Sequence, residues 1–256
     1  MLELVTPNER ARHGFSMKWQ EAYMRRFYDP GSGFVDGTTE FWNLCRKVIS
    51  PGSKILEIGS GPSNATSQTL AAIGELHGID LDPDVRENSA LTAAHVIGST
   101  DPFPANDEEY DACVSDFVLE HVEHPDRHLR EINRVLRPGG TYVFRTPNRW
   151  HYVSVIGSMT PFWFHRLVSH RARGLTGGEH EPYPTFYRMN SATHARALAS
   201  EHGLVPEQIR MIEKEPSYAM QSRILFLTFM AYERVVNSSD RLGFLRANIL
   251  GVLRKP

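Results

Sequence analysis

The chain has very few cysteines, only two among its 256 residues. Cys45 lies in a stretch with helical periodicity and Cys113 in an apolar stretch typical of a strand, so both are expected to be buried apolar residues. Two isolated cysteines indicate neither a disulfide framework nor a cysteine-based metal site. This usage fits the reducing cytosol, and the sequence therefore favours a cytoplasmic protein.

Long hydrophobic runs and an excess of basic residues are also lacking. The longest apolar run, residues 224–232, falls well short of the roughly 20 residues that cross a bilayer. Residues 1–10 have no apolar core of the kind found in signal peptides. The net charge of −2 and the pI near 6.6 give no general field for a polyanion. A transmembrane helix, a secretory leader and a nucleic-acid partner are therefore not expected.

Metal-ligand spacing is the third absence. The histidines and glutamates after residue 150 show neither helical i, i+4 ligand pairs nor a neighbouring cysteine, so no metal site is expected. The members of this loose group are His151, His165, His170, His180, Glu179 and Glu181. The acidic run at residues 80–84 is not a calcium loop, because Val85 stands where such a loop needs glycine. An Asp-x-Asp glycosyltransferase metal site at this run is a minor alternative.

The most informative stretch is residues 54–64, Lys-Ile-Leu-Glu-Ile-Gly-Ser-Gly-Pro-Ser-Asn. Its apolar residues predict a buried parallel strand, and Gly59 and Gly61 predict a tight turn into an amphipathic helix over residues 63–73. Glycines let a ligand approach the backbone, and the N-terminus of the helix offers free N–H groups. The stretch therefore predicts a ligand-binding turn.

Glu57 decides between the ligands that use such a turn. A dinucleotide site needs a third glycine where this chain has Asn64, and a carboxylate two residues before the turn would repel a diphosphate but attract a sulfonium or ammonium group. The stretch resembles motif I of the class I S-adenosylmethionine-dependent methyltransferases, with Ser63 in place of the last glycine. The resemblance implies that S-adenosylmethionine is the cofactor and that Glu57, Gly59, Ser60 and Gly61 hold it.

The resemblance continues into the next strands. Residues 75–83 are expected to form a short strand that ends in acids, roughly 20 residues past the turn, where such sites recognise ribose. By resemblance, Asp80 accepts hydrogen bonds from both ribose hydroxyls and Leu81 lies against adenine. After an expected third strand at residues 94–97, the adenine-facing Asp of the family is missing. Adenine contacts are therefore assigned to Ser99 and Thr100.

A longer stretch corroborates this reading. Residues 110–122, 129–140 and 141–148 resemble the fourth strand, the crossing helix and the fifth strand of the type 11 methyltransferases, a group that is ubiquinone- or menaquinone-biosynthesis-like. The pattern includes a Pro-Gly-Gly stop at the end of the crossing helix. Ser115 and Asp116, at the end of the fourth strand, are expected at the cofactor.

The resemblance covers about residues 50–150 and implies an α/β fold. The expected architecture is a Rossmann-like, doubly wound, mostly parallel seven-stranded sheet in a single methyltransferase domain over residues 1–256. Its expected parts are an N-terminal helical cover (1–50), a cofactor-binding core (50–150), a substrate insertion or lid (149–190) and a C-terminal part (191–256).

Two terminal features leave alternatives open. Helical periodicity over residues 17–27 and 38–49 predicts either a cover over the cofactor cleft or a pair that only packs on the sheet edge. Residues 241–256 combine apolar and basic side chains. Such a segment either makes peripheral contact with an anionic membrane or packs on its own domain.

The acceptor pocket is expected between the end of the fifth strand and the insertion, because ligands of open parallel sheets bind at the carboxyl ends of the strands. An aromatic helix is expected at residues 161–169. The loop at 174–184 is either a lid or a solvated connector. The polar groups of the pocket are predicted to be Asn148, His151, Tyr183 and Tyr187.

Methyl transfer from a sulfonium needs alignment, exclusion of water and a base rather than a metal. We therefore expect a methyltransferase that acts on an oxygen or nitrogen atom of a small molecule, lipid-like and sugar-like acceptors included. His121 and His151 are the candidate bases, and each has an equal alternative as a buried structural histidine. Two other functions stay open. One is an NAD(P)-dependent Rossmann oxidoreductase, which Glu57 and Asn64 disfavour, and the other is a catalytically silent cofactor-binding module.

Overall fold

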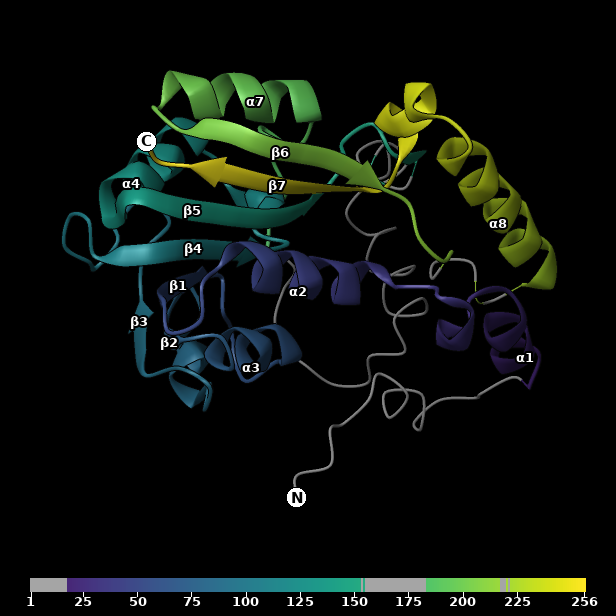
Figure 1. Ribbon diagram of the computed structural model, residues 1–256, viewed down its shortest axis with the longest axis horizontal. Helices are drawn as coiled ribbons and strands as arrows, with labels where there is room; N and C mark the ends of the chain where they lie inside the picture. The colour runs from purple at the N-terminus through teal and green to yellow at the C-terminus, as the bar shows by residue number, and fades with distance from the viewer. Residues whose placement is uncertain (1–17, 153, 155–182, 217–219, 221) are drawn as a thin grey trace.

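A seven-stranded sheet lies at the centre of the computed structural model, which describes residues 18–152, 154, 183–216, 220 and 222–256 (Figure 1). The strands are β1 (Lys54–Ile58), β2 (Glu75–Asp80), β3 (Ala93–Val96), β4 (Tyr110–Asp116), β5 (Leu136–Pro147), β6 (Val205–Ile212) and β7 (Asn248–Arg254). The aromatic helix expected at 161–169 and nearly all of the loop expected at 174–184 lie outside the described residues.

The strand order is β3-β2-β1-β4-β5-β7-β6, and β7 runs antiparallel to both of its neighbours while the other pairs are parallel. The order reverses between β1 and β4, and open α/β sheets bind ligands beyond the carboxyl ends of the strands at such a reversal. The expected Rossmann-like, mostly parallel seven-stranded α/β fold is confirmed.

Helices cover both faces of the sheet (Figure 1). They are α1 (Lys18–Phe27), α2 (Gly37–Val48), α3 (Ala65–Ala71), α4 (Pro125–Val135), α7 (Ala192–Glu201) and α8 (Arg223–Asn237), with short 3₁₀ turns η2 (Pro30–Ser32), η3 (Pro83–Glu87), η4 (Leu119–His121) and η6 (Asp240–Leu245). Successive strand residues face opposite layers. Ile55 packs with α2 and α3, and Leu56 packs with α4 and α7.

The two N-terminal helices separate in the fold. α2 packs on the sheet, whereas α1 packs against α8 at one end of the molecule (Figure 1). Trp19 of α1 and Phe226 of α8 meet edge to face with ring centroids 6.2 Å apart. The Tyr28 hydroxyl donates a hydrogen bond to Glu233 Oε2 over 3.1 Å. α2 therefore packs on a face of the sheet rather than on its edge, and α1 packs on α8. A cover over the cofactor cleft stays a prediction.

Residues 248–254 pack on their own domain, which is one of the two alternatives that the sequence left open for the C-terminal segment. They form β7, which lies between β5 and β6, and Ile249, Leu250, Val252 and Leu253 are buried there. A strand that is buried on both faces shows no alternation of apolar and polar residues. Its apolar run, with basic residues beside it, can therefore be mistaken for an amphipathic surface segment. The apolar side chains on which membrane contact was expected to rest are largely inside the protein.

The Pro-Gly-Gly stop is corrected. α4 ends at Val135, and Leu136 already pairs with Tyr110 in the sheet before the register of β4 and β5 shifts. Gly139, with φ of 77°, lies in this irregular part of β5. A left-handed residue at a register shift is typical of a β-bulge, so the glycines serve the strand rather than the helix.

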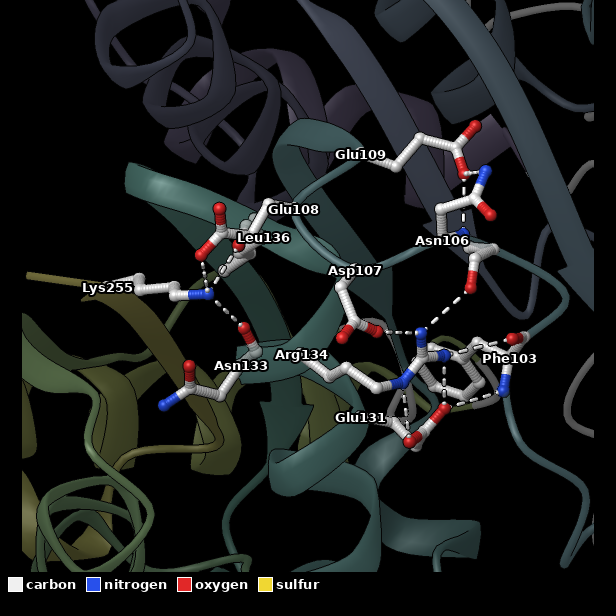
Figure 2. Close-up of polar contacts among 11 residues, drawn as sticks. Phe103, Asn106, Asp107, Glu108, Glu109, Glu131, Asn133, Arg134, Leu136 and Lys255 are labelled. Carbon is white, nitrogen blue, oxygen red and sulfur yellow. Dashed lines mark hydrogen bonds and ion pairs between the residues drawn. The ribbon is translucent and has the colours of Figure 1, made fainter.

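The connection between β3 and β4, which contains Ser99 and Thr100, is held from the side of α4 (Figure 2). All N–H groups of the Arg134 guanidinium donate hydrogen bonds. Their acceptors are Glu131 Oε1 (3.0 Å), Glu131 Oε2 (2.7 Å), Ala105 O (2.8 Å), Asp107 Oδ1 (2.9 Å) and Phe103 O (3.0 Å). Arginine is suited to this task because its planar fork presents several donors in fixed directions.

Both cysteines are free and buried, and burial raises the pKa of each thiol, as expected for apolar residues. Among the described residues, no group of His, Cys, Asp and Glu side chains is suited to hold a metal ion. None of the helices in the described part of the chain is long and apolar enough to span a membrane. His165, His170 and His180 lie outside that part of the chain, so independence from metals stays a prediction.

Candidate cofactor and acceptor site

The turn after β1 is as tight as its glycines predict. Gly59 and Gly61 have φ of 71° and 53°, a region that favours glycine. A Cβ atom at Gly59 would overlap the side chain of Val118, so the turn also lies directly against the residue before η4. Ser60 is buried against Gly78, and its hydroxyl has no hydrogen-bond partner among the described residues.

Asp80 lies beside this turn, at the carboxyl end of β2. Its Oδ2 accepts a hydrogen bond from Gly61 N over 2.7 Å, and its Oδ1 accepts one from Asp82 N over 2.8 Å. A carboxylate has about four acceptor positions, so each oxygen retains a lone pair for a ribose hydroxyl. Leu81 is 43% exposed, which leaves its side chain open to a flat ring. Asp80 thus lies beside the glycine turn, and the contacts of both residues with ribose and adenine stay predictions.

Glu57 is buried at 3% exposure, with its carboxyl beneath the glycine turn. Ser67 Oγ donates a hydrogen bond to Glu57 Oε2 over 2.6 Å. Burial raises the pKa of this carboxyl to about 7, against the opposing effect of the Ser67 hydrogen bond, and the nearby carboxylates of Asp116 and Asp80 raise it further. A cation above the turn would favour the ionised form, because opposite charges stabilise each other in a poorly solvated site.

Two asparagines that the sequence did not single out as functional hold the turn in place. Asn88, only 4% exposed, donates from Nδ2 to Ser60 O (3.3 Å), Gly61 O (3.2 Å) and Ser67 Oγ (3.0 Å). Asn64 caps α3, because its Oδ1 accepts a hydrogen bond from Ser67 N over 2.9 Å. The cap has a sequence signal, an Asn directly before a helix, but Asn88 has none.

Asp116, at the carboxyl end of β4, is paired with a residue that the sequence analysis missed. Arg145 of β5 donates to both of its oxygens, from Nε over 2.6 Å and from a terminal nitrogen over 2.7 Å. Thr66 Oγ1 adds a third bond to the same carboxylate over 3.1 Å. The carboxylate is therefore neutralised and fixed from the adjacent strand, so it shapes the site more than it offers charge to a ligand.

The side chain of Ser115 is buried in the core, and its hydroxyl shares a 2.6 Å hydrogen bond with the Tyr142 hydroxyl. A contact between Ser115 and the cofactor stays a prediction. Phe117, two residues later, has φ of 58°, which a residue with a Cβ rarely adopts. Such strain concentrates at functional sites, and here it lies between β4 and η4.

Ser99 and Thr100 are exposed on the connection after β3. Asp101, which follows them, accepts a hydrogen bond from Gly98 N over 2.7 Å and so closes the turn that presents both residues. Their contact with adenine stays a prediction.

His121 is placed by a backbone carbonyl. Its Nδ1 lies 2.8 Å from Pro184 O, and because a carbonyl only accepts, the ring donates from Nδ1 and a neutral imidazole then has its lone pair on Nε2. Tyr183 lies beside it, with ring centroids 6.1 Å apart. Burial raises the pKa of Tyr183, and the carboxylates of residues 80, 82 and 84 add to this effect. Tyr183 thus connects the candidate base to the ribose side of the site.

His151 and Asn148, by contrast, are built into the core. His151 is 3% exposed, with Nε2 3.4 Å from Glu213 Oε2 and its ring 4.1 Å from that of Tyr152. Asn148 Nδ2 donates to the carbonyls of Phe244 and Arg246 over 2.7 and 2.8 Å. The structural alternative therefore describes His151. Asn148 therefore holds the chain through its amide nitrogen, and its role in an acceptor pocket stays a prediction.

Tyr187 lies against η4, and a buried carboxyl that the sequence analysis missed lies within that turn. The backbone N–H groups of Phe186 and Tyr187 donate to Glu120 O over 2.7 and 3.2 Å. The Glu120 side chain is buried and accepts a hydrogen bond from Thr146 Oγ1 over 3.1 Å, and burial raises its pKa to about 7. Segment 183–187 is therefore tied to the residues that precede α4, as an acceptor pocket in this place requires.

Comparisons with known proteins agree with this geometry. Residues 56–144 match a family model described as a methyltransferase domain. An uncharacterized methyltransferase of Mycobacteroides abscessus is 31% identical over 137 residues, which cover 49% of this chain and 52% of that relative. The match thus spans about half the length of that relative.

Two solved structures share the fold. A chain from the complex between the Haloferax volcanii Trm112 methyltransferase activator and a methyltransferase has a TM-score of 0.57 at 21% identity, covering 92% of this chain and 95% of that chain. A geranyl diphosphate methyltransferase, solved with GPP and sinefungin, has a TM-score of 0.56 at 14% identity, covering 85% of this chain and 78% of that chain. The resemblance to the class I S-adenosylmethionine-dependent methyltransferases is therefore confirmed over residues 56–144, which contain both the glycine turn and Asp80.

Proposed function

We propose that this chain transfers the methyl group of S-adenosylmethionine to an oxygen or nitrogen atom of a small molecule. The observation that carries the proposal is the glycine turn after β1, whose Gly61 N–H is bonded to Asp80 and which lies above the buried Glu57. This arrangement combines acceptors for a ribose with negative charge for a cation. The chain is proposed to act as one methyltransferase domain in the cytoplasm. The two free cysteines support the cytoplasmic location, because disulfides are rare in that compartment.

The residues of the turn fit the adenosyl cofactor better than a dinucleotide. Asp80 has lone pairs for the ribose, Leu81 offers an exposed apolar surface for adenine, and Glu57 favours the cationic end. A diphosphate would need free N–H groups at the turn. Gly61 N is already bonded to Asp80 and Ser67 N to Asn64, and the surrounding charge is negative.

His121 is the proposed base. When bound, S-adenosylmethionine supplies a methyl group on a cationic sulfur. His121 Nε2 would accept the proton that the acceptor atom loses when it is methylated. The hydrogen bond from Nδ1–H to Pro184 O keeps the imidazole in the tautomer whose Nε2 carries the lone pair. Tyr183 and Tyr187 are proposed to line the acceptor pocket next to it.

Calorimetry tests the cofactor assignment directly. We expect S-adenosylmethionine and S-adenosylhomocysteine to bind and NADH and NADPH to be silent, because the turn repels a diphosphate and attracts a cation. Tight NADH binding would instead make the chain an oxidoreductase. Methyl transfer to metabolite extracts from labelled S-adenosylmethionine, with and without a chelator, then tests turnover. Binding without any labelled product would identify a silent cofactor-binding module.

A further inference from the structure

An open cleft of about 610 Å³ lies between the start of α4, segment 185–188 and α7. α4 and α7 pack side by side on one face of the sheet (Figure 1), and residues of both helices line the cleft. Apolar side chains supply part of its wall, and basic side chains together with two acidic ones, Glu123 and Asp126, supply much of the rest. The basic side chains that line it are His124, Arg149, Arg188 and His194.

The two arginines are oriented by aromatic rings rather than by acids. Arg149 Cζ lies 5.1 Å from the centre of the Trp150 ring, and Arg188 Cζ lies 6.0 Å from that of Phe186. Among the described residues, no carboxylate forms an ion pair with either guanidinium. Asp126, one of the two acids at the cleft, is instead paired with the His202 ring over 3.1 Å. The hydrogen-bond donors of both arginines are therefore open to a ligand.

The cleft shares a wall with the proposed reaction centre. Phe186 and Tyr187 line the cleft, and their backbone N–H groups donate to Glu120 O. The next residue is His121, whose ring donates to Pro184 O from the same segment. Residues 184–187 therefore separate the cleft from His121. A small molecule that is held at one end in the cleft can reach His121 with its other end.

We propose that this cleft binds an oxyanion, a phosphate ester or a carboxylate, carried by the methyl acceptor. The inference rests on the proposed function and adds the chemical class of the acceptor to it. Arg149 and Arg188 are the anchoring residues, because guanidinium groups present paired donors that match the oxygens of both anions. The acceptor is then an anionic small molecule whose nucleophilic oxygen or nitrogen lies away from its charged end.

The test uses inorganic phosphate and malonate as probes, titrated into the full chain in the presence of S-adenosylhomocysteine. We expect saturable binding of at least one probe, and at least tenfold weaker binding after Arg149→Gln or Arg188→Gln. Tighter binding of phosphate identifies a phosphate ester, and tighter binding of malonate identifies a carboxylate. Arg127→Gln is the matched control, since Arg127 is exposed on α4 but does not line the cleft. It should leave probe binding unchanged.

The outcomes separate this inference from the proposed function. S-adenosylhomocysteine should bind equally to all of these variants, because none of the substituted residues lies at the glycine turn. A chain that binds S-adenosylhomocysteine but neither probe overturns the oxyanion site alone. Probe binding that is insensitive to both cleft substitutions does the same. Failure to bind S-adenosylhomocysteine overturns the proposed function and, with it, this inference.

Discussion

Replacing Glu57 by glutamine should make the cofactor-free protein more stable above neutral pH and weaken cofactor binding. The carboxyl is buried, and its pKa is raised from 4.5 to about 7, chiefly by burial. Glutamine has nearly the same shape and can still accept the hydrogen bond from Ser67 Oγ. It has no proton to lose, so the cost of burying a charge disappears.

The size of the effect follows from the two pKa values. Between 4.5 and about 7, the unfolded state releases the Glu57 proton while the folded state retains it. The folded state therefore binds more protons, and its stability falls as the pH rises through this range. At about 1.4 kcal/mol per pKa unit, the wild type should lose about 2.5 kcal/mol more than Glu57→Gln between about pH 5 and about pH 8.

Urea unfolding of both proteins at these two pH values measures the difference. Burial also raises the pKa values of Glu120 and Glu215, but both residues are present in each protein, so their contributions cancel in the comparison. Glu87→Gln, a change of an exposed carboxyl, is the control and should leave the pH dependence unaltered. Equal pH slopes for wild type and Glu57→Gln would refute the argument. At about pH 8, calorimetry should also show weaker binding of S-adenosylhomocysteine to Glu57→Gln, because its ammonium group loses a negative partner.

Three further changes address other parts of the site. Asp80→Ala should weaken S-adenosylhomocysteine binding by about 1–3 kcal/mol in calorimetry, because charge-assisted hydrogen bonds to the ribose are lost; an unchanged affinity would refute the ribose assignment. His121→Gln should lower kcat by about 10²-fold or more near neutral pH, while cofactor affinity stays nearly constant. Equal turnover would remove this histidine as the base. Arg134→Lys should cost about 2 kcal/mol in urea unfolding, because lysine offers fewer donors to the connection after β3. A loss below about 0.5 kcal/mol would show that water replaces these bonds.

The sequence predicted the parts of the site that depend on neighbouring residues. The strand, the glycine turn and the acid at the end of β2 follow each other at short range, and each has its own local pattern. The Asp116–Arg145 pair and the Asn88 contacts join residues that are far apart in the chain, and no local signal marks them. The direction of the Ser115 side chain had no sequence signal either, because a residue at a strand end can face either layer, and here it faces Tyr142.

The sequence did not predict a strand at residues 248–254, and the reason is different there. Its sequence has apolar residues at consecutive positions with basic residues behind them, which is equally compatible with an amphipathic surface segment. The requirement for glycine at position 251 has a clear spatial cause, because a Cβ there would overlap the Phe144 ring of β5. That cause lies in a partner strand, so it becomes visible only once the pairing is known.

The position of β7 between β5 and β6 also constrains how the protein folds. β5 and β6 are separated in the sheet by a strand that follows both of them in the chain, and the pair Thr141 and Arg254 is among the contacts that must form to fill the gap. Such distant pairings are slow, because much chain must be ordered before they add stability. Until β7 inserts, one edge of β5 is unpaired, and β6 has no strand to pair with. We therefore expect this edge to be the surface through which folding intermediates of the chain associate with one another.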